Sequence, residues 1–122
     1  MSGVIRPAKD VPPRPVERAD GAVMRVLIGP DDHAPHFVTR KFTIQPGGRI
    51  PKHRHPTIEH EQYVLSGRMR LGIGGEVREV SAGDAVFIPA GTPHWYENHG
   101  TEPVEFLCVV PRTPSYPTEW LE

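Results

Sequence analysis

The sequence has one cysteine, no long apolar run and no block of charge of one sign. Its lone Cys108 cannot form an internal disulfide, which agrees with a reducing compartment. No stretch approaches the roughly 20 apolar residues that cross a bilayer, and residues 1–15 lack the apolar segment of a signal peptide. We therefore expect a cytoplasmic protein that makes no membrane contact.

A strongly charged face is absent as well. The 14 basic and 15 acidic residues are spread along the 122-residue chain and give a formal net charge of −1. Nucleic-acid binding requires a basic face, so we expect a small-molecule partner and no nucleic acid. The length fits one domain that buries a core without disulfides.

Long helices are absent for a different reason. Fifteen prolines and twelve glycines break any helical period and leave apolar runs of strand length. Strands are predicted near residues 23–28, 37–45, 49–54, 60–66, 68–73, 76–80, 85–88, 93–98 and 104–110. Short strands without helices indicate an all-β sandwich or barrel that must close its edges, and a jelly roll is one such fold.

The two ends of the chain differ from the middle. Residues 1–20 are proline-rich and look like an extended arm that needs a partner surface, so we predict a homodimer in which this arm contacts the neighbouring barrel. Residues 21–113 form the predicted barrel. Residues 114–122 form a tail in which further prolines argue against a strand.

Three histidines lie close together in the stretch KHRHPTIEHE, residues 52–61. His53 and His55 are two residues apart, so on a strand both imidazoles leave the same face. If the next strand begins near residue 59, His60 points to one face and its neighbours Glu59 and Glu61 point to the other. This parity favours His60 as a third metal ligand, whereas the rival register makes Glu59 or Glu61 the ligand.

A fourth ligand should come from a distant strand that passes beside the first pair. The stretch GDAVFIPAGTPHWYEN, residues 83–98, offers His94 after a Pro-Ala-Gly turn that redirects the chain. A plainer interpretation of His94 is a residue that begins a strand and caps the turn. The remaining histidines, His33, His36 and His99, fall in polar loops or at strand ends, and we expect them in solvent.

Both stretches resemble the two sequence motifs of the cupin superfamily. The first motif combines a glycine, His-x-His, a glutamate position and a second glycine, and it is matched by Gly47, His53, His55, position 60 and Gly67. The second combines Gly, Pro-x-Gly, His and Asn, and it is matched by Gly83, Pro89, Gly91, His94 and Asn98. The resemblance covers residues 47–98 and implies a double-stranded β-helix, the jelly-roll barrel of the cupins.

One position departs from the usual motif, because His60 stands where most metal-binding cupins have glutamate. The chain therefore resembles the small single-domain cupins with four histidine ligands, some of which bind manganese and some copper or other divalent metals. The resemblance implies one divalent transition metal, with Mn, Fe or Cu favoured and Ni or Zn compatible, on the ligands His53, His55, His60 and His94. Four neutral imidazoles leave the ion its full charge, so the site should prefer anions.

Strand parity adds candidates for the pocket around this metal. Arg40 falls on the apolar, inward face of residues 37–45, where it either reaches out to water or holds a substrate carboxylate or enolate. Arg40 and Tyr96 are the catalytic candidates. The substrate-pocket candidates are Gln62, Phe106 and Cys108; the last two also suit a plain core, but they match positions that lie close to the metal in the resembled subgroup.

Three functions fit such a site. The favoured one is a metal-dependent, dioxygenase-like oxidoreductase that acts on a small organic substrate, since open histidine-rich cupin sites often do such chemistry. The second is an isomerase or lyase that uses the metal as a Lewis acid, for which the sequence offers no clear base. The third is a non-catalytic cupin that binds a ligand through its metal.

Overall fold

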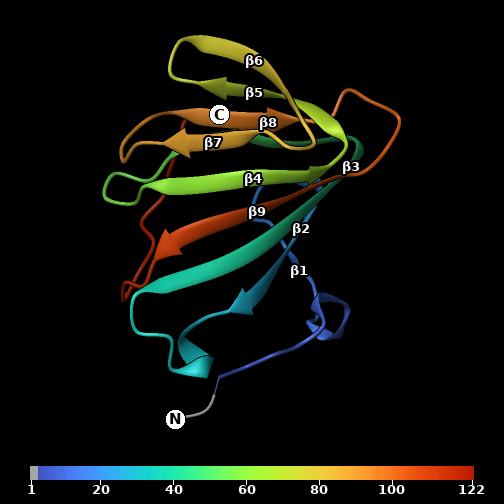
Figure 1. Cartoon of the computed structure of the whole chain (residues 1–122). Helices are drawn as coiled ribbons and strands as arrows, with labels where there is room; N and C mark the ends of the chain where they lie inside the picture. Colours follow the sequence, from blue (N-terminus) through green and yellow to red (C-terminus); the bar gives the residue numbers. More distant parts are fainter. Residues whose placement is uncertain (1–2) are drawn as a thin grey trace.

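The computed structural model describes residues 3–122, and their regular structure is almost entirely β-strand (Figure 1). The elements in chain order are η1 (Ala8–Asp10), β1 (Arg14–Pro15), β2 (Asp20–Ile28), η2 (Pro30–Asp32), β3 (Phe37–Arg54), β4 (His60–Ser66), β5 (Arg68–Ile73), β6 (Glu76–Ser81), β7 (Ala85–Ile88), β8 (His94–Glu97), β9 (Val104–Pro111) and β10 (Glu119–Trp120). No helix in this part of the chain is long and apolar enough to cross a membrane.

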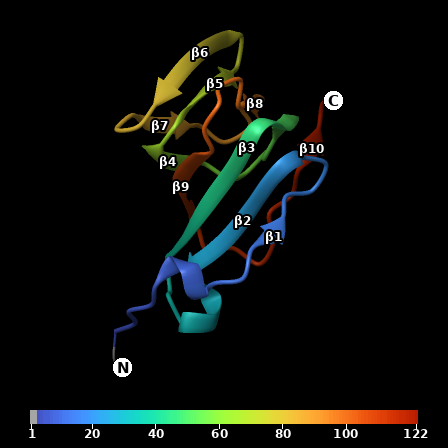
Figure 2. The ribbon, with the colours of Figure 1, turned by 90° about the vertical axis from the view of Figure 1, so that its right-hand side faces the viewer.

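The strands form one sheet that curls around the core. Its main path is β6-β5-β8-β3-β9-β4-β7; β2 and β10 also pair with β3, and β1 pairs with β2. The long strand β3 belongs to both halves, because residues 37–44 pair with β9 and residues 49–53 pair with β8. Figures 1 and 2 show the strands β9, β4 and β7 on one side of the barrel and β8 and β5 on the other. The predicted double-stranded β-helix is confirmed.

Every predicted strand has an observed counterpart, with one difference in β3. The runs 37–45 and 49–54 are one strand, joined through a bend at residues 45–48. Gly47 has a φ of +80°, a left-handed conformation that favours glycine. A Cβ on Gly48 would lie 2.8 Å from the carbonyl oxygen of Asp20 in β2. Glycine therefore allows β2 and β3 to approach closely at the bend, where their register shifts between the pairs Ala22–Ile44 and Asp20–Arg49.

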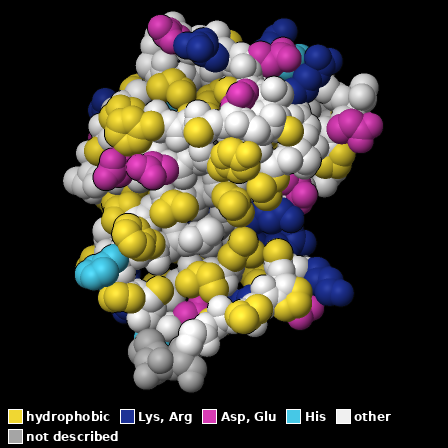
Figure 3. All heavy atoms as spheres, in the orientation of Figure 1, with side chains coloured by type: hydrophobic (Ala, Val, Ile, Leu, Met, Phe, Trp, Pro, Cys, Tyr) yellow, Lys and Arg dark blue, Asp and Glu magenta, His cyan; other side chains and the backbone are white. Residues whose placement is uncertain are grey.

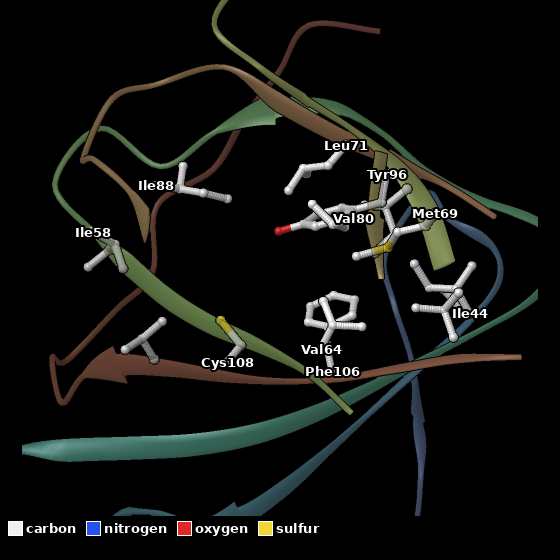
Figure 4. Close-up of a cluster of buried hydrophobic side chains, with 14 of the residues drawn as sticks. Ile44, Ile58, Val64, Met69, Leu71, Val80, Ile88, Tyr96, Phe106 and Cys108 are labelled. Carbon is white, nitrogen blue, oxygen red and sulfur yellow. The ribbon is translucent and has the colours of Figure 1, made fainter. Parts of the chain in front are cut away.

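Side chains from both halves alternate into the core. In β9 the buried positions are Val104, Phe106, Cys108 and Val110, and they point inward as the parity of this run predicts. β4 shows the same alternation, with His60, Gln62 and Val64 buried. Figure 4 shows the apolar cluster between the halves, with Met69 and Ile44 towards one end and Cys108 and Ile58 towards the other. The buried histidines His53, His60 and His94 are among the polar side chains that this interior contains.

Asn98 fixes the bend of β3. Its side chain is fully buried; Nδ2 donates to the carbonyl oxygens of Ile44 at 2.9 Å and Glu102 at 2.8 Å, and Oδ1 accepts from the Gly100 N–H at 3.0 Å. The backbone N–H and C=O of Asn98 also bond to the glycine pair of the bend, at 2.9 and 2.8 Å. The asparagine that ends the second motif is therefore a structural residue.

Both ends of the chain pack on the barrel more closely than expected from the sequence. β1 pairs with β2 of the same chain, and Val16 and Ala19 pack against the core, so part of the expected arm 1–20 is ordered on its own barrel; residues 1 and 2 lie outside the described residues. In the tail 114–122, Glu119 and Trp120 pair with β3 as β10. The prolines do not prevent this pairing because both residues follow the last of them, Pro117.

The outer face of β4 and β7 carries more apolar surface than an ordinary solvated strand. Tyr63 and Phe87 are 47% and 54% exposed, and together with Leu107 and Val109 they line a shallow hollow. Figure 3 shows hydrophobic side chains gathered across this face. A patch of this kind suits an interaction surface. The predicted homodimer stays a prediction, which light scattering tests.

Replacing Asn98 with alanine should lower the free energy of unfolding by about 2–3 kcal/mol, because it leaves the carbonyls of Ile44 and Glu102 and the N–H of Gly100 without their side-chain partner. Urea unfolding followed by circular dichroism measures this loss. The control is Glu102→Ala, which keeps the backbone acceptor and removes an exposed side chain. Equal stability of both variants would show that the bend does not need the amide.

Candidate metal centre

Two stretches far apart in sequence meet where β3 ends. His53 lies opposite His94 in the pairing of β3 with β8, and opposite Trp120 in the pairing of β3 with β10. His55 follows directly after β3, and its carbonyl oxygen accepts from the Gly91 N–H at 2.9 Å. The turn that precedes His94 is thus bonded to the residue that follows the strand of His53. This contact brings the two motifs together.

His60 begins β4 and points into the barrel. It is 4% exposed, whereas Glu59 and Glu61 on either side are exposed. Its Nδ1 lies 3.7 Å from the buried sulfur of Cys108. The inward face of β4 is therefore the one predicted, and the rival register with an inward glutamate does not occur.

The four imidazoles form one cluster. Ring centroids lie 4.3 Å apart for His53 and His94, 5.0 Å for His53 and His55, 4.8 Å for His55 and His60, and 5.4 Å for His60 and His94. The candidate ligand nitrogens of His53, His55 and His94 all lie within 4.8 Å of one another, as around a single ion. His60 stacks on His55 beside this trio.

The hydrogen bonds of the imidazole rings engage Nδ1 and leave Nε2 available to a metal. Nδ1 of His53 lies 2.7 Å from the Pro51 carbonyl oxygen, and Nδ1 of His94 lies 2.9 Å from that of Thr92. A carbonyl accepts only from an Nδ1–H, so the lone pair of each of these imidazoles is on Nε2. Nε2 of His94 is buried and has no hydrogen-bond partner among residues 3–122. These donors therefore suit a divalent ion, which would satisfy the buried nitrogen.

The barrel keeps these histidines neutral. Burial lowers the pKa of His55 to about 4, assisted by the charge of His53, and lowers the pKa of His94 to about 3, again assisted by His53. Burial and the positive charge of Arg40 lower the pKa of His60 to about 2. Burial also lowers the pKa of His53. Neutral imidazole is the form that binds a metal.

A row of polar side chains lies beside the histidines on three neighbouring strands. Arg40 of β3 pairs in register with Cys108 of β9, which pairs with Gln62 of β4. Arg40 Nη2 lies 3.2 Å and Gln62 Nε2 lies 3.5 Å from the Cys108 sulfur. Arg40 Nε and Gln62 Oε1 are buried, and within residues 3–122 neither has a hydrogen-bond partner. Buried polar atoms without partners are rare, and both of these atoms are available to a polar group inside the barrel.

Tyr96 faces this row from β8. Gln62 Nε2 donates to its phenolic oxygen at 2.7 Å, and the hydroxyl points into the barrel interior (Figure 4). Burial, with a contribution from Cys108, raises the pKa of Tyr96 above its ordinary value, so the phenol stays protonated. Phe106 is fully buried and stacks on Tyr96 with ring centroids 5.2 Å apart. Phe106 therefore supports Tyr96 from within the core.

The C-terminal segment also reaches the histidines, which the sequence did not predict. The carbonyl oxygen of Pro117 lies 3.3 Å and the hydroxyl of Thr118 lies 3.1 Å from Nδ1 of His55. The ring of Trp120 lies 5.0 Å from that of His53, centroid to centroid. The proline-rich composition of the tail carries no signal for these contacts. Only the pairing of β10 with β3 brings them about.

The other three histidines take no part in the cluster. His33 and His36 are exposed. His99 is exposed as well, with its Nε2 3.4 Å from a carboxylate oxygen of Glu79. The prediction that these side chains lie in solvent is confirmed.

Comparison with known sequences finds relatives for most of the chain. The family model of the cupin domain matches residues 40–110. An uncharacterized protein of Methanocaldococcus jannaschii, MJ1618, is 34% identical over 105 residues, which cover 85% of this chain and 80% of that protein. Oxalate decarboxylase OxdC of Bacillus subtilis is 36% identical over 72 residues, which cover 55% of this chain and 19% of that enzyme.

Among solved structures, the polyketide cyclase RemF from Streptomyces resistomycificus is similar over the whole chain. It superposes with a TM-score of 0.88 at 35% sequence identity and covers 100% of this chain and 87% of that one. The similarity therefore includes both ends of the chain as well as the two motifs.

In the metal-free protein, stability should decrease as the pH is lowered from about 7 towards 4. The unfolded chain takes up protons at its histidines near pH 6.5, whereas His55, His94 and His60 stay neutral in the fold down to about 4, 3 and 2. Each such histidine lowers the free energy of unfolding by up to about 1.4 kcal/mol per pH unit in that window. Urea unfolding at a series of pH values measures the slope.

His60→Gln should reduce the slope of unfolding free energy against pH by the contribution of one histidine, up to about 1.4 kcal/mol per pH unit. The matched change His36→Gln, at an exposed histidine, should leave the slope unchanged. A wild-type profile that is flat between about pH 7 and 5, or equal slopes for the two variants, would contradict the assignment.

Proposed function

This chain belongs to the cupin-domain family, and we propose that it is a metal-dependent enzyme that acts on a small, anionic or enolisable organic compound. The proposal combines two adjacent sites inside the barrel. One is the histidine cluster, which would hold the metal. The other is the row of Arg40, Gln62 and Tyr96, which would hold the oxygen atoms of the substrate.

The residues that would hold the ion are His53, His55, His60 and His94. The burial of His53, His60 and His94, the lowered pKa values of the four histidines, and the engagement of Nδ1 in His53, His55 and His94 support this role. Manganese, iron or copper fits best, and imidazole also suits nickel and zinc. A divalent ion bound there supplies Lewis-acid polarisation of a substrate oxygen.

The single observation that carries the proposal is the position of Arg40 beside His60, with a donor atom that has no partner among residues 3–122. Its guanidinium points into the barrel, close enough to His60 for its charge to lower the pKa of that histidine. Its hydrogen-bonding contact is the Cys108 thiol, and its Nε is buried without a partner among residues 3–122. A half-buried cation with one buried, unpartnered donor and no ion pair to a carboxylate among residues 3–122 is suited to an anionic substrate oxygen.

Gln62 adds a hydrogen-bond acceptor to the site, and Tyr96 adds a hydrogen-bond donor. The free Oε1 of Gln62 accepts a hydrogen bond from a substrate hydroxyl. Tyr96 receives a hydrogen bond from Gln62, so its own proton is available to a second substrate oxygen. The three side chains together would orient a compound that carries an oxyanion beside a hydroxyl or carbonyl group.

The reaction that fits these groups best is an enolate-forming step of the kind needed in ring closure. Arg40 would stabilise the enolate oxygen and Tyr96 would donate a hydrogen bond. No carboxylate among residues 3–122 is buried in this wall, so the α-proton would pass to a water molecule and not to a carboxylate side chain. The substrate should therefore have acidic α-hydrogens, as β-dicarbonyl compounds do. The full-length likeness to a polyketide cyclase at 35% identity supports this class.

A second candidate is the dioxygenase-like oxidoreductase favoured by the sequence. The donor set is compatible with it, because imidazole ligands suit redox-active iron and copper. Enolates are also ready electron donors, so the two reactions share a substrate class. They differ in whether oxygen is consumed.

We expect the wild-type protein to bind one equivalent of Mn²⁺, determined by elemental analysis, and His60→Ala to bind it about tenfold or more weakly. Glu59→Ala and Glu61→Ala should bind it normally, because both carboxylates face outward. The double change His53→Ala with His94→Ala should abolish binding.

His60→Glu should retain the ion, since a carboxylate at this position also reaches it. His36→Ala serves as the exposed-histidine control. Loss of metal in Glu59→Ala or Glu61→Ala, together with normal affinity in His60→Ala, would overturn the four-histidine assignment.

The metal-loaded protein should catalyse exchange of α-hydrogen for deuterium in a small β-diketone or β-keto acid, followed by NMR, without consuming oxygen. Arg40→Met should lower the exchange rate by about 100-fold, and Arg40→Lys by less, because one charged donor remains. The control Arg70→Met removes an exposed arginine that lies 3.8 Å from Glu97.

Oxygen uptake in proportion to substrate, recorded with an oxygen electrode, would favour the oxidoreductase instead. Absence of both activities in the Mn, Fe and Cu forms, combined with tight binding of the β-keto acid, would leave the ligand-binding role.

A further inference from the structure

Thr118 has two hydrogen-bonding neighbours, and together they fix the direction of the bond to His55. Its hydroxyl lies 3.2 Å from the Tyr116 carbonyl oxygen and 3.1 Å from Nδ1 of His55. A carbonyl can only accept, so the single hydroxyl proton goes to Tyr116. The hydroxyl oxygen is then an acceptor towards His55, which must carry its proton on Nδ1.

The carbonyl oxygen of Pro117 acts in the same direction, since it lies 3.3 Å from the same nitrogen. His53 and His94 obtain the equivalent bond from carbonyls of their own strand and turn. For His55, which is only partly buried and lies beyond the end of β3, both acceptors come from the C-terminal segment. The hydrogen bonds of His55 therefore depend on a segment outside the two motifs.

The segment is fastened to the barrel on both sides of Thr118. Upstream, the Tyr116 hydroxyl donates to the Pro111 carbonyl at 2.7 Å. Downstream, Trp120 pairs with His53 in β3, the Leu121 N–H donates to the Lys52 carbonyl at 2.8 Å, and Glu119 forms an ion pair with Arg54. Figure 2 shows β10 beside β3, close to the chain end. Thr118 is therefore held in place by contacts on both sides of it in the chain.

We propose that the C-terminal segment Tyr116–Trp120 is part of the metal centre, with Thr118 as the positioning residue of His55. Thr118 would hold the imidazole in the Nδ1–H tautomer and in the orientation that directs Nε2 at the ion. Trp120 covers the neighbouring ligand His53. The inference rests on the proposed metal-binding function, but the tautomer of His55 can be observed without metal.

The test compares Thr118→Val, which keeps the shape and loses the hydroxyl, with Thr118→Ser, which keeps the hydroxyl. Thr113→Val is the matched control, because Thr113 also donates to a carbonyl of the tail but touches no histidine. Competition with a fluorescent chelator measures Mn²⁺ affinity. We expect affinity to fall about tenfold or more in Thr118→Val and to stay within about twofold of wild type in the other two.

Long-range ¹H–¹⁵N NMR spectra of the metal-free proteins give the tautomer, with His55 assigned from the spectrum of His55→Gln. Wild type and Thr118→Ser should have the proton on Nδ1, and Thr118→Val should show a larger share of the Nε2–H form. Thermal unfolding of the metal-free variants checks that all remain folded.

The inference is overturned if Thr118→Val matches wild type in affinity and tautomer, if Thr118→Ser loses as much affinity as Thr118→Val, or if His55 of the wild type carries its proton on Nε2. If wild type binds no metal, the proposed function fails, and the tautomer spectra still decide whether Thr118 orients His55.

Discussion

The hydrogen bonds of Asn98 hold the bend of β3, and both parts of the candidate site depend on where that bend falls. Before the bend, β3 carries Arg40 next to β9; after it, the same strand carries His53 next to β8. A shift of one residue would turn every later side chain to the opposite face. His53 would then leave the barrel, whereas Arg40 would stay. A buried amide remote from the histidines therefore sets the geometry between a candidate metal ligand and the cation that would bind the substrate.

The interior around β3 contains neutral and positively charged side chains. The buried imidazoles are neutral, Arg40 is a cation, and no carboxylate among residues 3–122 is buried near them. A bound divalent ion would add further positive charge in a region where charges interact more strongly than in water. Such an interior disfavours cationic ligands before any specific contact forms. The same field favours the ionised form of a weakly acidic substrate.

Alternation within single strands predicts an all-β fold and the inward direction of His53 and His60, whereas the double-stranded β-helix and the full set of four histidines are implied by the resemblance to the cupin motifs. His53, His60 and the buried face of β9 are placed by parity, and parity does not depend on which strands pair. The contact between Thr118 and His55 has no such local rule, since it joins residues 63 positions apart through an irregular segment. The same applies to Arg40. Its inward direction is visible in the sequence, but its thiol neighbour follows from the pairing of β3 with β9.

The pairing of β3 also constrains the order in which the chain can fold. Phe37, at the start of β3, pairs with Pro111, and Arg54, at its end, pairs with Glu119. The strand is made early in synthesis and can pair at once with β2, but its other partners lie near the other end of the chain, and closing such long loops slows folding. The histidines near its end gather only when this closure is complete. Metal uptake at the candidate site would therefore be a late event of maturation, and a nascent chain in which β3 still lacks β8 and β9 presents a long free strand edge to its neighbours.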